Sequence, residues 1–490
     1  MDRRSEWLEK AEALRPRIFT QTVRPVSGMP DAALSEGGSV VLDFGDHFVG
    51  RLTLRLGSEG SHPDAPAWLQ FKFCENAREL DETLEGYRGW ISKGWVQQEQ
   101  IHVDVLPATV QLPRRYAFRY VKIDVLALSG KYRLRLEDAF ATASTCADDG
   151  AVEPLRGDAR DADIDRVARR TLRSCMQNVF EDGPKRDRRL WLGDLRLQAL
   201  ANYATYRNND LVKRCLYLFA GVADDAGRLP ACLFLEPRVE ADDTFMFDYA
   251  LFFIPTLLAY YRQTGDAEAA RELLPTALRQ LELSEEYFGE DGLVRDRDQL
   301  GWCFVDWNLN LNKQACAQAI WLYCANAAKE LCEALDSQKP EWLEARIAAR
   351  REAMLARLYD GERGLFVSGA NRQVSWASQV WAVLAGVIEG EGAARCLNAV
   401  KAAPDAVGMV TPYMMHHYIE ALCAVGRKDA ARDAMREYWG AMVDLGADTF
   451  WELFNPDDPD ESPYGSPVVN SYCHAWSCTP TWFLRSGILD

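Results

Sequence analysis

A polar segment between two helical patterns carries the residue types that a carbohydrate site needs. Residues 181–194 read EDGPKRDRRLWLGD, so three aspartates, three arginines, a lysine and a tryptophan stand close together. Carboxylate and guanidinium groups can bind sugar hydroxyls, an indole ring can cover the apolar face of a pyranose, and a further carboxyl group can transfer protons. A solvated turn between helices would not need the tryptophan. The segment therefore predicts a sugar site that could also do chemistry.

The elements that would position this segment follow the helical period from residue 148 onward. The sequence predicts twelve helices, over residues 164–179, 193–207, 210–223, 247–263, 267–288, 312–335, 341–358, 376–388, 392–402, 412–425, 429–445 and 474–484. An even number of helices joined by alternating short and long connections is typical of helical hairpins closed into a ring. We therefore expect an (α/α)6 barrel.

Long, aromatic-rich connections between these helices are the places where such a barrel can carry a site. They cover residues 181–192, 235–244, 296–311 and 447–470. In a ring of hairpins the loops at one end form a funnel around a central hollow, and polar groups can line its walls. We expect the four connections to share one rim.

The N-terminal part of the chain has a different period. Apolar and polar residues alternate in runs at 39–44, 50–56, 68–73, 100–105, 120–125 and 132–136. This alternation favours an antiparallel β-sandwich with solvated outer faces, preceded by a short helix. The predicted fold class is therefore an antiparallel β-sandwich followed by an (α/α)6 barrel, with the N-terminal helix in 1–16, the sandwich in 17–147 and the barrel in 148–490.

Composition limits the partners and the compartment. The formal net charge of −17 gives an average field that would repel nucleic acid and anionic membrane surfaces. The first residues lack the apolar core of a signal peptide, and no later run approaches the roughly 20 apolar residues of a membrane span. Most of the thirteen cysteines lie in helical apolar patterns, which favours buried reduced thiols. We expect a cytoplasmic protein with a carbohydrate ligand, and no nucleic-acid or membrane partner.

The polar segment resembles a motif of the bacterial α-L-rhamnosidases of glycoside hydrolase family 78. That motif runs Asp-Cys-Pro, one variable residue, Arg-Glu, three variable residues, Trp, one variable residue and Gly-Asp. The chain follows it at Asp182, Pro184, Arg186, Trp191, Gly193 and Asp194. Residues 441–452 look like a second family run, which ends in Trp-Glu. Similarity at 305–307, at 471–474 and in the N-terminal strands extends the resemblance over most of the chain.

The resemblance implies an inverting glycosidase that removes terminal α-L-rhamnosyl residues from small glycosides or oligosaccharides. Glu452 matches the family's general base, and Asp187 stands in the place of its general acid. In an inverting enzyme one carboxyl group protonates the leaving oxygen while an opposed carboxylate activates water, so the two stand roughly 6.5–9.5 Å apart. No cofactor and no metal ligand are expected.

Rhamnose is a 6-deoxy sugar, so its pocket needs an apolar patch for the methyl group beside groups that bind hydroxyls. By family position, the hydroxyl contacts are assigned to Asp182, Arg186, Asp194 and His474. Stacking or methyl contacts are assigned to Trp191, Trp307 and Trp451.

Three positions depart from the family pattern. The usual acid is Glu, and Asp187 is one methylene shorter. Gly183 stands where the family has cysteine, and Cys473 where it has asparagine. The shorter acid leaves two alternatives open, which are inverting hydrolysis of a different sugar and a relative that binds sugar without cleaving it.

Several residues also have a purely structural interpretation. Lys185, Arg188 and Arg189 are expected to form a solvated basic face. Asp194 stands where an early helical turn favours an acid. A long loop between predicted strands carries Trp90, and we favour a structural role for this loop or a place at the rim of the barrel.

Overall fold

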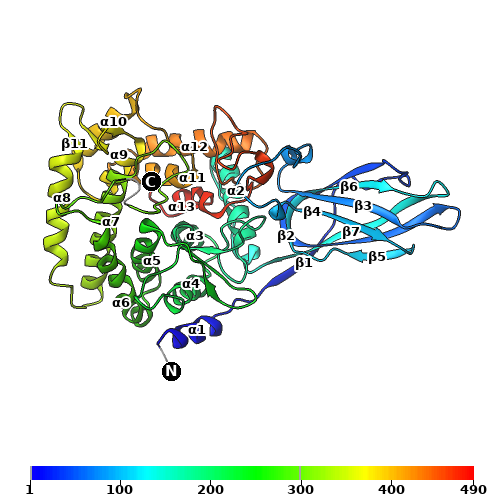
Figure 1. The fold of residues 1–490 in the computed structure, drawn as a ribbon, viewed down its shortest axis with the longest axis horizontal. Helices are drawn as coiled ribbons and strands as arrows, with labels where there is room; N and C mark the ends of the chain where they lie inside the picture. Colours follow the sequence, from blue (N-terminus) through cyan, green and yellow to red (C-terminus); the bar gives the residue numbers. More distant parts are fainter. Residues whose placement is uncertain (1–2, 297–299) are drawn as a thin grey trace.

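The computed structural model describes residues 3–296 and 300–490. The strands of its large sheet gather on one side of the molecule and its long helices on the other (Figure 1). The N-terminal helix α1 (Arg3–Ala13) lies beside the helical part and packs against α4 (Asn209–Gly221). The division of the chain at residues 16/17 and 147/148 stays a prediction.

One antiparallel sheet contains the seven strands of the N-terminal part. They are β1 (Phe19–Val23), β2 (Ser39–Gly60), β3 (Ala67–Cys74), β4 (Gln98–Val103), β5 (Ala108–Gln111), β6 (Tyr116–Ala127) and β7 (Tyr132–Thr145). The strand order is β1-β7-β2-β6-β3-β4, and β5 pairs with β2. Buried side chains of β2, β3, β6 and β7 form one apolar cluster, as expected for two facing layers.

The long strand β2 joins the two layers. Its first half pairs with β6 through residue 50, and its second half pairs with β7 from residue 50 onward. The sequence predicted two strands here because Gly45 and its neighbours interrupt the alternation. The structure instead contains a register shift between Asp43 and Phe48, and Gly45 has a φ of 77°, so the strand bends without ending. Strands β1 and β5 were not predicted.

The helical part follows the predicted hairpins. Its helices are α2 (Ala159–Cys175), α3 (Leu192–Ala204), α4, α5 (Phe247–Thr264), α6 (Ala267–Leu283), α7 (Gln314–Ala334), α8 (Leu343–Leu358), α9 (Trp376–Leu384), α10 (Gly390–Lys401), α11 (Pro412–Ala424), α12 (Lys428–Asp444) and α13 (Pro480–Arg485). Local signals fix their ends: Thr411 caps α11 with its hydroxyl ahead of Pro412, and Gly265 ends α5 with a φ of 70°. Among the residues that the structure describes, no helix is both long enough and apolar enough to cross a lipid bilayer.

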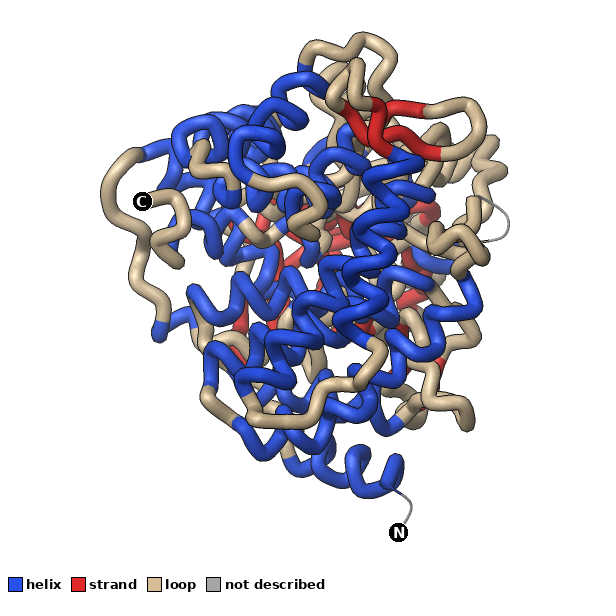
Figure 2. The backbone as a smooth tube through the Cα atoms, turned by 90° about the vertical axis from the view of Figure 1, so that its left-hand side faces the viewer, coloured by secondary structure: helices blue, strands red, loops and turns tan. Residues whose placement is uncertain are grey.

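These helices form a double ring. The inner helices α3, α5, α7, α9 and α11 contact one another in that order, and each packs against the outer helix that follows it in the chain. The short α13 completes the inner ring because it contacts α3 and the outer helix α2. Figure 2 shows the helices packed side by side across this part of the molecule. The arrangement is the predicted (α/α)6 barrel.

The last predicted helix, 474–484, was wrong in extent. A 3-10 turn, η7 (Ala475–Ser477), precedes α13, and His474 is the extended residue before that turn. Pro480 lacks the backbone N–H that would continue a helix through this point, and it instead occupies the first turn of α13, where that N–H is not needed. The loops of the barrel also contain two three-stranded sheets. The first consists of β8 (Leu190–Trp191), β9 (Cys232–Phe234) and β10 (Glu240–Ala241), and the second of β11 (Tyr359–Asp360), β12 (Leu365–Ser368) and β13 (Gln373–Val374).

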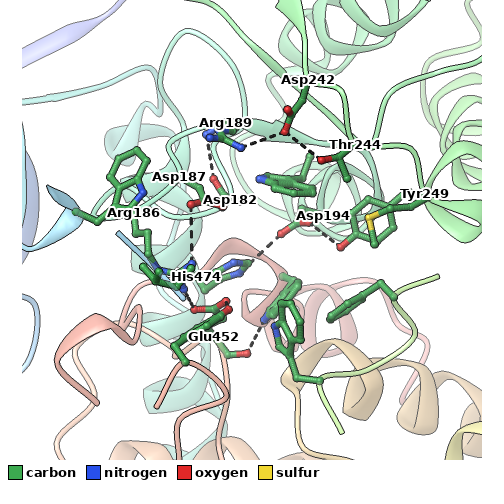
Figure 3. A pocket seen from close by; sticks show the side chains of 18 of the residues that line it. Asp182, Arg186, Asp187, Arg189, Asp194, Asp242, Thr244, Tyr249, Glu452 and His474 are labelled. Carbon is green, nitrogen blue, oxygen red and sulfur yellow. Dashed lines mark hydrogen bonds and ion pairs between the residues drawn. The ribbon is translucent and has the colours of Figure 1, made fainter. Parts of the chain in front are cut away.

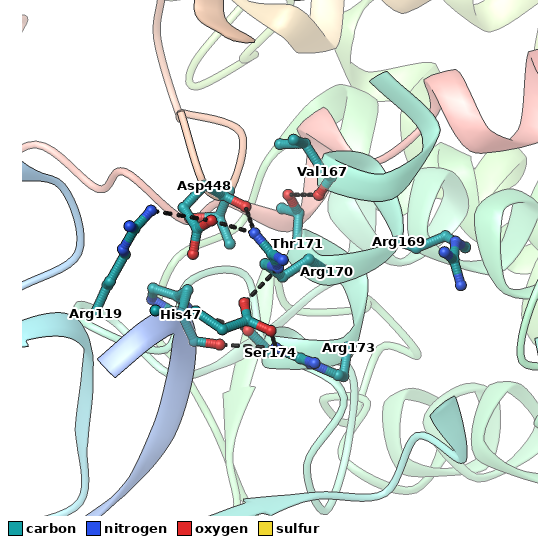
Figure 4. Close-up of polar contacts among 12 residues, drawn as sticks. His47, Arg119, Val167, Arg169, Arg170, Thr171, Arg173, Ser174 and Asp448 are labelled. Atoms are coloured by element: carbon teal, nitrogen blue, oxygen red, sulfur yellow. Dashed lines mark hydrogen bonds and ion pairs between the residues drawn. The ribbon is translucent and has the colours of Figure 1, made fainter. Parts of the chain in front are cut away.

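An ionic network joins the sheet to the barrel (Figure 4). Arg119 of β6 binds Asp43 at 2.9 Å and approaches Asp448 of the barrel at 3.5 Å. On the barrel side, Arg170 of α2 is paired with Asp448, and the neighbouring Arg173 donates to the His47 carbonyl at 2.8 Å. Since these groups are largely withdrawn from solvent, they hold the sheet in a fixed position relative to the rim.

Candidate active site

A pocket of about 260 Å³ opens where the barrel rim meets the sheet. Its lining comprises Trp90, Ile91, Ser92, Trp95, Asp182, Arg186, Asp187, Arg189, Trp191, Asp194, Asp242, Thr244, Met246, Tyr249, Trp302, Phe304, Trp307, Glu452, Tyr464, His474 and Trp476. All four connections predicted to share one rim contribute to it, so that prediction is confirmed. Residues 297–299 of the third connection lie outside the described residues.

The polar segment reaches the pocket as a closed hairpin. Asp182 and Arg189 are joined by a backbone hydrogen bond of 3.0 Å, and the Asp182 carboxylate accepts another from the Arg189 N–H at 3.0 Å. Between them, Asp187 and Arg188 have φ values of 65° and 53°. Non-glycine residues seldom adopt this left-handed conformation, and aspartate tolerates it better than most. The backbone is thus bent at the residue that occupies the predicted acid position.

Arg186 lies between the two predicted catalytic carboxylates (Figure 3). Its guanidinium is buried, forms an ion pair with Glu452 and stands 3.9 Å from the Asp187 carboxylate. Its Nε donates to the Val469 carbonyl at 3.1 Å, and its guanidinium carbon lies 4.4 Å from the centre of the Tyr464 ring. One cation therefore positions both acids, which come from opposite ends of the barrel sequence.

Glu452 is buried, and hydrogen bonds fix both oxygens of its carboxylate. The Tyr464 hydroxyl donates a hydrogen bond to one of its oxygens, and Arg186 binds the other. Burial raises the pKa of Glu452 above its ordinary value, whereas the charge of Arg186 and the Tyr464 hydrogen bond lower it and the charge of Asp187 raises it. The Trp476 indole N–H donates to the Glu452 carbonyl at 2.9 Å. Both ends of this residue are thus fixed.

Two further buried carboxyl groups line the pocket beside the pair. Burial, together with the charges of Asp187 and Asp194, raises the pKa of Asp182 well above its usual range. Burial likewise raises the pKa of Asp194, which accepts from the Tyr249 hydroxyl at 3.2 Å and faces His474 Nδ1 at 3.7 Å. Burial and the charge of Arg186 hold the pKa of His474 well below its ordinary value, so this imidazole is neutral.

Gly193 makes the Asp194 position possible. A Cβ on Gly193 would stand 2.3 Å from the Tyr249 ring, which leaves room for no side chain. Asp194 lies in the first turn of α3, as the structural interpretation expected, and its carboxylate also points into the pocket, where it binds Tyr249.

Aromatic rings form the other wall. Trp191 meets Tyr249 edge to face at 6.1 Å between ring centres, and Trp307 contacts Phe304 at 5.1 Å. Trp476 stacks on Phe304 at 5.2 Å. Edge and face of these rings provide the apolar surface that one side of a deoxy sugar needs.

The structure brings eight of the nine predicted site residues into the pocket lining: Asp182, Arg186, Asp187, Trp191, Asp194, Trp307, Glu452 and His474. Trp451 is not part of that lining. Its ring is buried and packs edge to face on Phe454 and Tyr472. Neighbouring residues in an extended loop point to opposite sides, so when Glu452 faces the pocket Trp451 faces the core.

The expected solvated basic face was wrong for Lys185 and Arg189. Lys185 is buried, paired with Glu79 of the sheet region, and donates to the Asn470 carbonyl at 2.8 Å. Arg189 lines the pocket and binds Asp242 at 3.2 Å. These partners are distant in sequence, and the periodicity of the segment does not reveal them.

The two other departures from the family motif lie behind the pocket. A Cβ on Gly183 would stand 3.1 Å from the Ser471 hydroxyl, so the turn is tight. Cys473 is buried with its sulfur 4.0 Å from the sulfur of Cys175. It contacts the barrel wall, while the adjacent His474 faces the pocket.

Sequence reasoning missed two functional candidates. Tyr464 holds Glu452 from a loop without any period, and its only signal was a position near the Trp-Glu run. Tyr249 holds Asp194 from the first turn of α5.

Potential metal ligands gather elsewhere among the described residues. His47, Glu75 and Cys473 bring ligand atoms within 4.8 Å of one another, and so do His416, His417 and Glu420. None of these residues lines the pocket. In the second group Arg196 stands 3.0 Å from His417 and binds Glu420, so a cation already occupies that electrostatic position.

Comparison with known families and structures agrees with this geometry. The family model described as the bacterial alpha-L-rhamnosidase 6 hairpin glycosidase domain matches residues 159–488, and that of the glycosyl hydrolase family 78 alpha-rhamnosidase N-terminal domain matches residues 9–143. The chain belongs to the bacterial α-L-rhamnosidase family. It is a glycosidase of glycoside hydrolase family 78.

Solved rhamnosidases resemble this family member over most of its length. A rhamnosidase from Klebsiella oxytoca with rhamnose bound is 47% identical, with 98% of each chain covered and a TM-score of 0.94. A family 78 rhamnosidase of Bacillus sp. GL1 is 24% identical, and the match covers 91% of this chain and 46% of the Bacillus chain with a TM-score of 0.77. The Streptomyces avermitilis α-L-rhamnosidase complexed with L-rhamnose is 16% identical, and the match covers 96% of this chain and 44% of the Streptomyces chain with a TM-score of 0.69. The last two show the fold alone. No curated protein matches the chain.

Proposed function

We propose that the enzyme removes terminal α-L-rhamnosyl residues from small glycosides or oligosaccharides with inversion of the anomeric configuration. Asp187 is the general acid and Glu452 the general base. The observation that carries the proposal is their shared pocket, in which Arg186 approaches both carboxylates. The rhamnose bound to the Klebsiella relative supports the choice of sugar.

In this mechanism Asp187 donates a proton to the glycosidic oxygen as the bond to the anomeric carbon breaks. Glu452 accepts a proton from a water molecule that attacks the opposite face of the same carbon. Arg186 and Tyr464 favour the carboxylate form of Glu452, which a base requires. The Asp187 side chain is about 20% exposed, more than that of Glu452, so it is suited to meet the leaving group on the open side.

Asp182 and Asp194 are proposed to bind the hydroxyl groups of the sugar. Burial raises the pKa of each carboxyl group well above its ordinary value, and a protonated carboxyl can both donate to and accept from a sugar hydroxyl. Asp194 Oδ1 and His474 Nδ1 have no hydrogen-bond partner within the described part of the chain. Hydroxyl groups of a bound sugar would supply those partners.

The aromatic wall is proposed to accept the apolar face and the methyl group of rhamnose. Trp191 and Trp307 line the pocket, and the indole N–H of each lacks a partner in the described structure. Each ring can therefore combine an apolar contact with a hydrogen bond to the ligand. Trp451, packed behind Glu452, is proposed to position that residue without touching the substrate.

We also propose a cytoplasmic location. All thirteen cysteines are free thiols, and all but Cys423 are buried. A chain that keeps so many thiols unpaired suits a reducing compartment.

The direct test is hydrolysis of an aryl α-L-rhamnoside followed by proton NMR from the first seconds. The β anomer of rhamnose should appear first and then mutarotate. Initial release of the α anomer would contradict inversion. Release of sugar only from other members of a panel of aryl glycosides would favour the same hydrolysis on a different sugar.

A further inference from the structure

Two tryptophans are exposed at the pocket. Trp90 has 66% and Trp302 has 48% of its surface accessible, and no other tryptophan of the described residues is as exposed. Both line the pocket, yet they come from different parts of the fold: Trp90 from the connection between β3 and β4, and Trp302 from the barrel. A single exposed apolar residue needs no explanation, but two large rings at the same opening do.

The loop that carries Trp90 is fixed to the barrel. Tyr87 and Val96 of this loop pack in one buried cluster with Tyr464, Val468 and Val469. A Cβ at Gly89 would stand 1.9 Å from the Tyr464 carbonyl oxygen, so the loop backbone runs directly against the barrel loop. The loop is thus held in place on both sides of Trp90.

Trp90 is packed on one side and open on the other. Its ring lies 5.3 Å from Tyr464 and 6.4 Å from Trp307, both edge or tilted contacts. Trp302 is anchored through its carbonyl, which accepts from the Phe247 N–H at 2.9 Å. The Trp90 indole is therefore positioned before any ligand arrives, which lowers the entropy that binding must overcome, and the backbone of Trp302 is fixed.

Polar groups at one end of the pocket are partly paired with one another, although Arg189 Nε has no partner among the described residues. Arg189 binds Asp242 at 3.2 Å, and Thr244 donates to the same carboxylate at 3.4 Å. In Figure 3 these three residues lie at the end of the pocket away from Glu452. A leaving group that reaches the two exposed indoles would meet aromatic faces, an environment that suits a planar aryl ring better than a second hydroxylated sugar.

We propose that Trp90 and Trp302 bind the leaving group of the substrate and select glycosides with an aryl aglycone. The inference rests on the proposed function, because the acids and the inner aromatic wall must hold the rhamnosyl group for the aglycone to reach these indoles. The β-sheet region, through the loop of Trp90, thereby takes part in substrate specificity.

The test compares two substrates that share the sugar and differ in the leaving group. α-L-Rhamnosyl fluoride has no ring to stack, and 4-methylumbelliferyl α-L-rhamnoside has two fused rings. Trp90→Ala should lower the ratio of kcat/KM for the aryl substrate to kcat/KM for the fluoride by about tenfold, the worth of one aromatic stack. Trp302→Ala should act in the same direction, and Trp90→Phe should retain most of the ratio. Leu309→Ala, which removes an exposed side chain outside the lining, should leave both constants unchanged.

Three outcomes would overturn the inference. An equal loss on both substrates in Trp90→Ala would mean that Trp90 only supports Tyr464. A rhamnosyl disaccharide that loses as much as the aryl substrate would mean that the indoles bind a pyranose. A wild-type enzyme that cleaves neither rhamnoside would refute the proposed function, and this inference with it, whereas the first two outcomes leave the proposed function intact.

Discussion

The Tyr464 hydroxyl donates its hydrogen bond to the Glu452 carboxylate, and the same phenol ring lies under the Arg186 guanidinium. Burial raises the pKa of Glu452 above its ordinary value even with these two partners in place, and each partner lowers the pKa from what burial alone would give. The tyrosine and the arginine thus favour the carboxylate form of the proposed base against the effect of burial. Trp90 of the sheet region packs on this tyrosine, so the N-terminal part of the chain supports the catalytic centre indirectly.

Tyr464→Phe should move the acidic limb of the pH profile of kcat/KM to higher pH. The hydrogen bond favours the carboxylate and lowers the pKa of Glu452, so its loss raises that pKa and a higher pH is needed to ionise the base. A hydrogen bond to a charged group is worth about 1.5–3 kcal/mol, which corresponds to roughly one to two pH units. The profile is measured with an aryl rhamnoside between pH 3 and 9.

Tyr261→Phe is the matched control for that measurement. Its hydroxyl donates at 3.1 Å to the Ala334 carbonyl at an exposed site on α5. The acidic limb of the pH profile of the Tyr261→Phe enzyme should coincide with that of the wild type. A Tyr464→Phe limb that stays in place, or moves to lower pH, would show that another group sets it.

Asp187→Asn should show a loss of activity that depends on the leaving group. An amide cannot protonate the glycosidic oxygen, and general acid catalysis contributes about 10²–10⁴-fold. An alkyl or sugar leaving group needs that proton, whereas fluoride needs little assistance. We expect a loss near the top of this range for an unactivated rhamnoside and a much smaller one for rhamnosyl fluoride. Glu452→Gln should inactivate the enzyme on both substrates.

Equal losses across the leaving groups would argue against Asp187 as the proton donor. In that case Asp182→Asn becomes the informative variant, because its carboxyl group also lines the pocket and has a strongly raised pKa. Dependence on the leaving group in Asp182→Asn, together with none in Asp187→Asn, would reassign the acid.

The helical hairpins could be predicted because their signals are local. The apolar period predicted a helix from residue 412, and the structure begins α11 at that residue, where Thr411 caps the helix ahead of Pro412. The shared rim followed from topology, since loops at one end of a ring must meet. The long strand β2 was predicted as two strands because a bend at Gly45 looks like a turn when the pairing partners are unknown.

The parts that escaped prediction depend on contacts between distant segments. Lys185 looked solvated because its partner Glu79 stands in the sheet region, more than a hundred positions earlier. Trp451 and Glu452 are neighbours in the sequence, and only the path of their loop decides which of them faces the pocket. The acid and base positions came from the family motif and not from periodicity.

Gly193→Ala should reduce both activity and stability. The added Cβ would stand 2.3 Å from the buried Tyr249 ring, which must shift and draw its hydroxyl away from Asp194. Overpacking of this kind costs about 1–3 kcal/mol of unfolding free energy. We expect kcat/KM to fall at least about tenfold, since displacement of a substrate ligand by an ångström is costly. Gly361→Ala is the control, because nothing lies within 4 Å of its Cβ. A Gly193→Ala enzyme with normal kinetics would remove the proposed role of Asp194.

Lys185→Met should destabilise the protein far more than loss of a surface ion pair. The Lys185–Glu79 pair is buried between the sheet region and the barrel, and removal of the lysine leaves a buried carboxylate without its cation. Such a loss costs about 3–5 kcal/mol. In Arg262→Met, which breaks the exposed pair with Glu330, the cost should be no more than about 1 kcal/mol. Urea unfolding followed by tryptophan fluorescence measures both.

The double variant Lys185→Met with Glu79→Leu should recover part of the lost stability, because it also removes the buried carboxylate that has lost its cation. If Lys185→Met unfolds at the same urea concentration as Arg262→Met, the pair does not hold the two parts of the fold together.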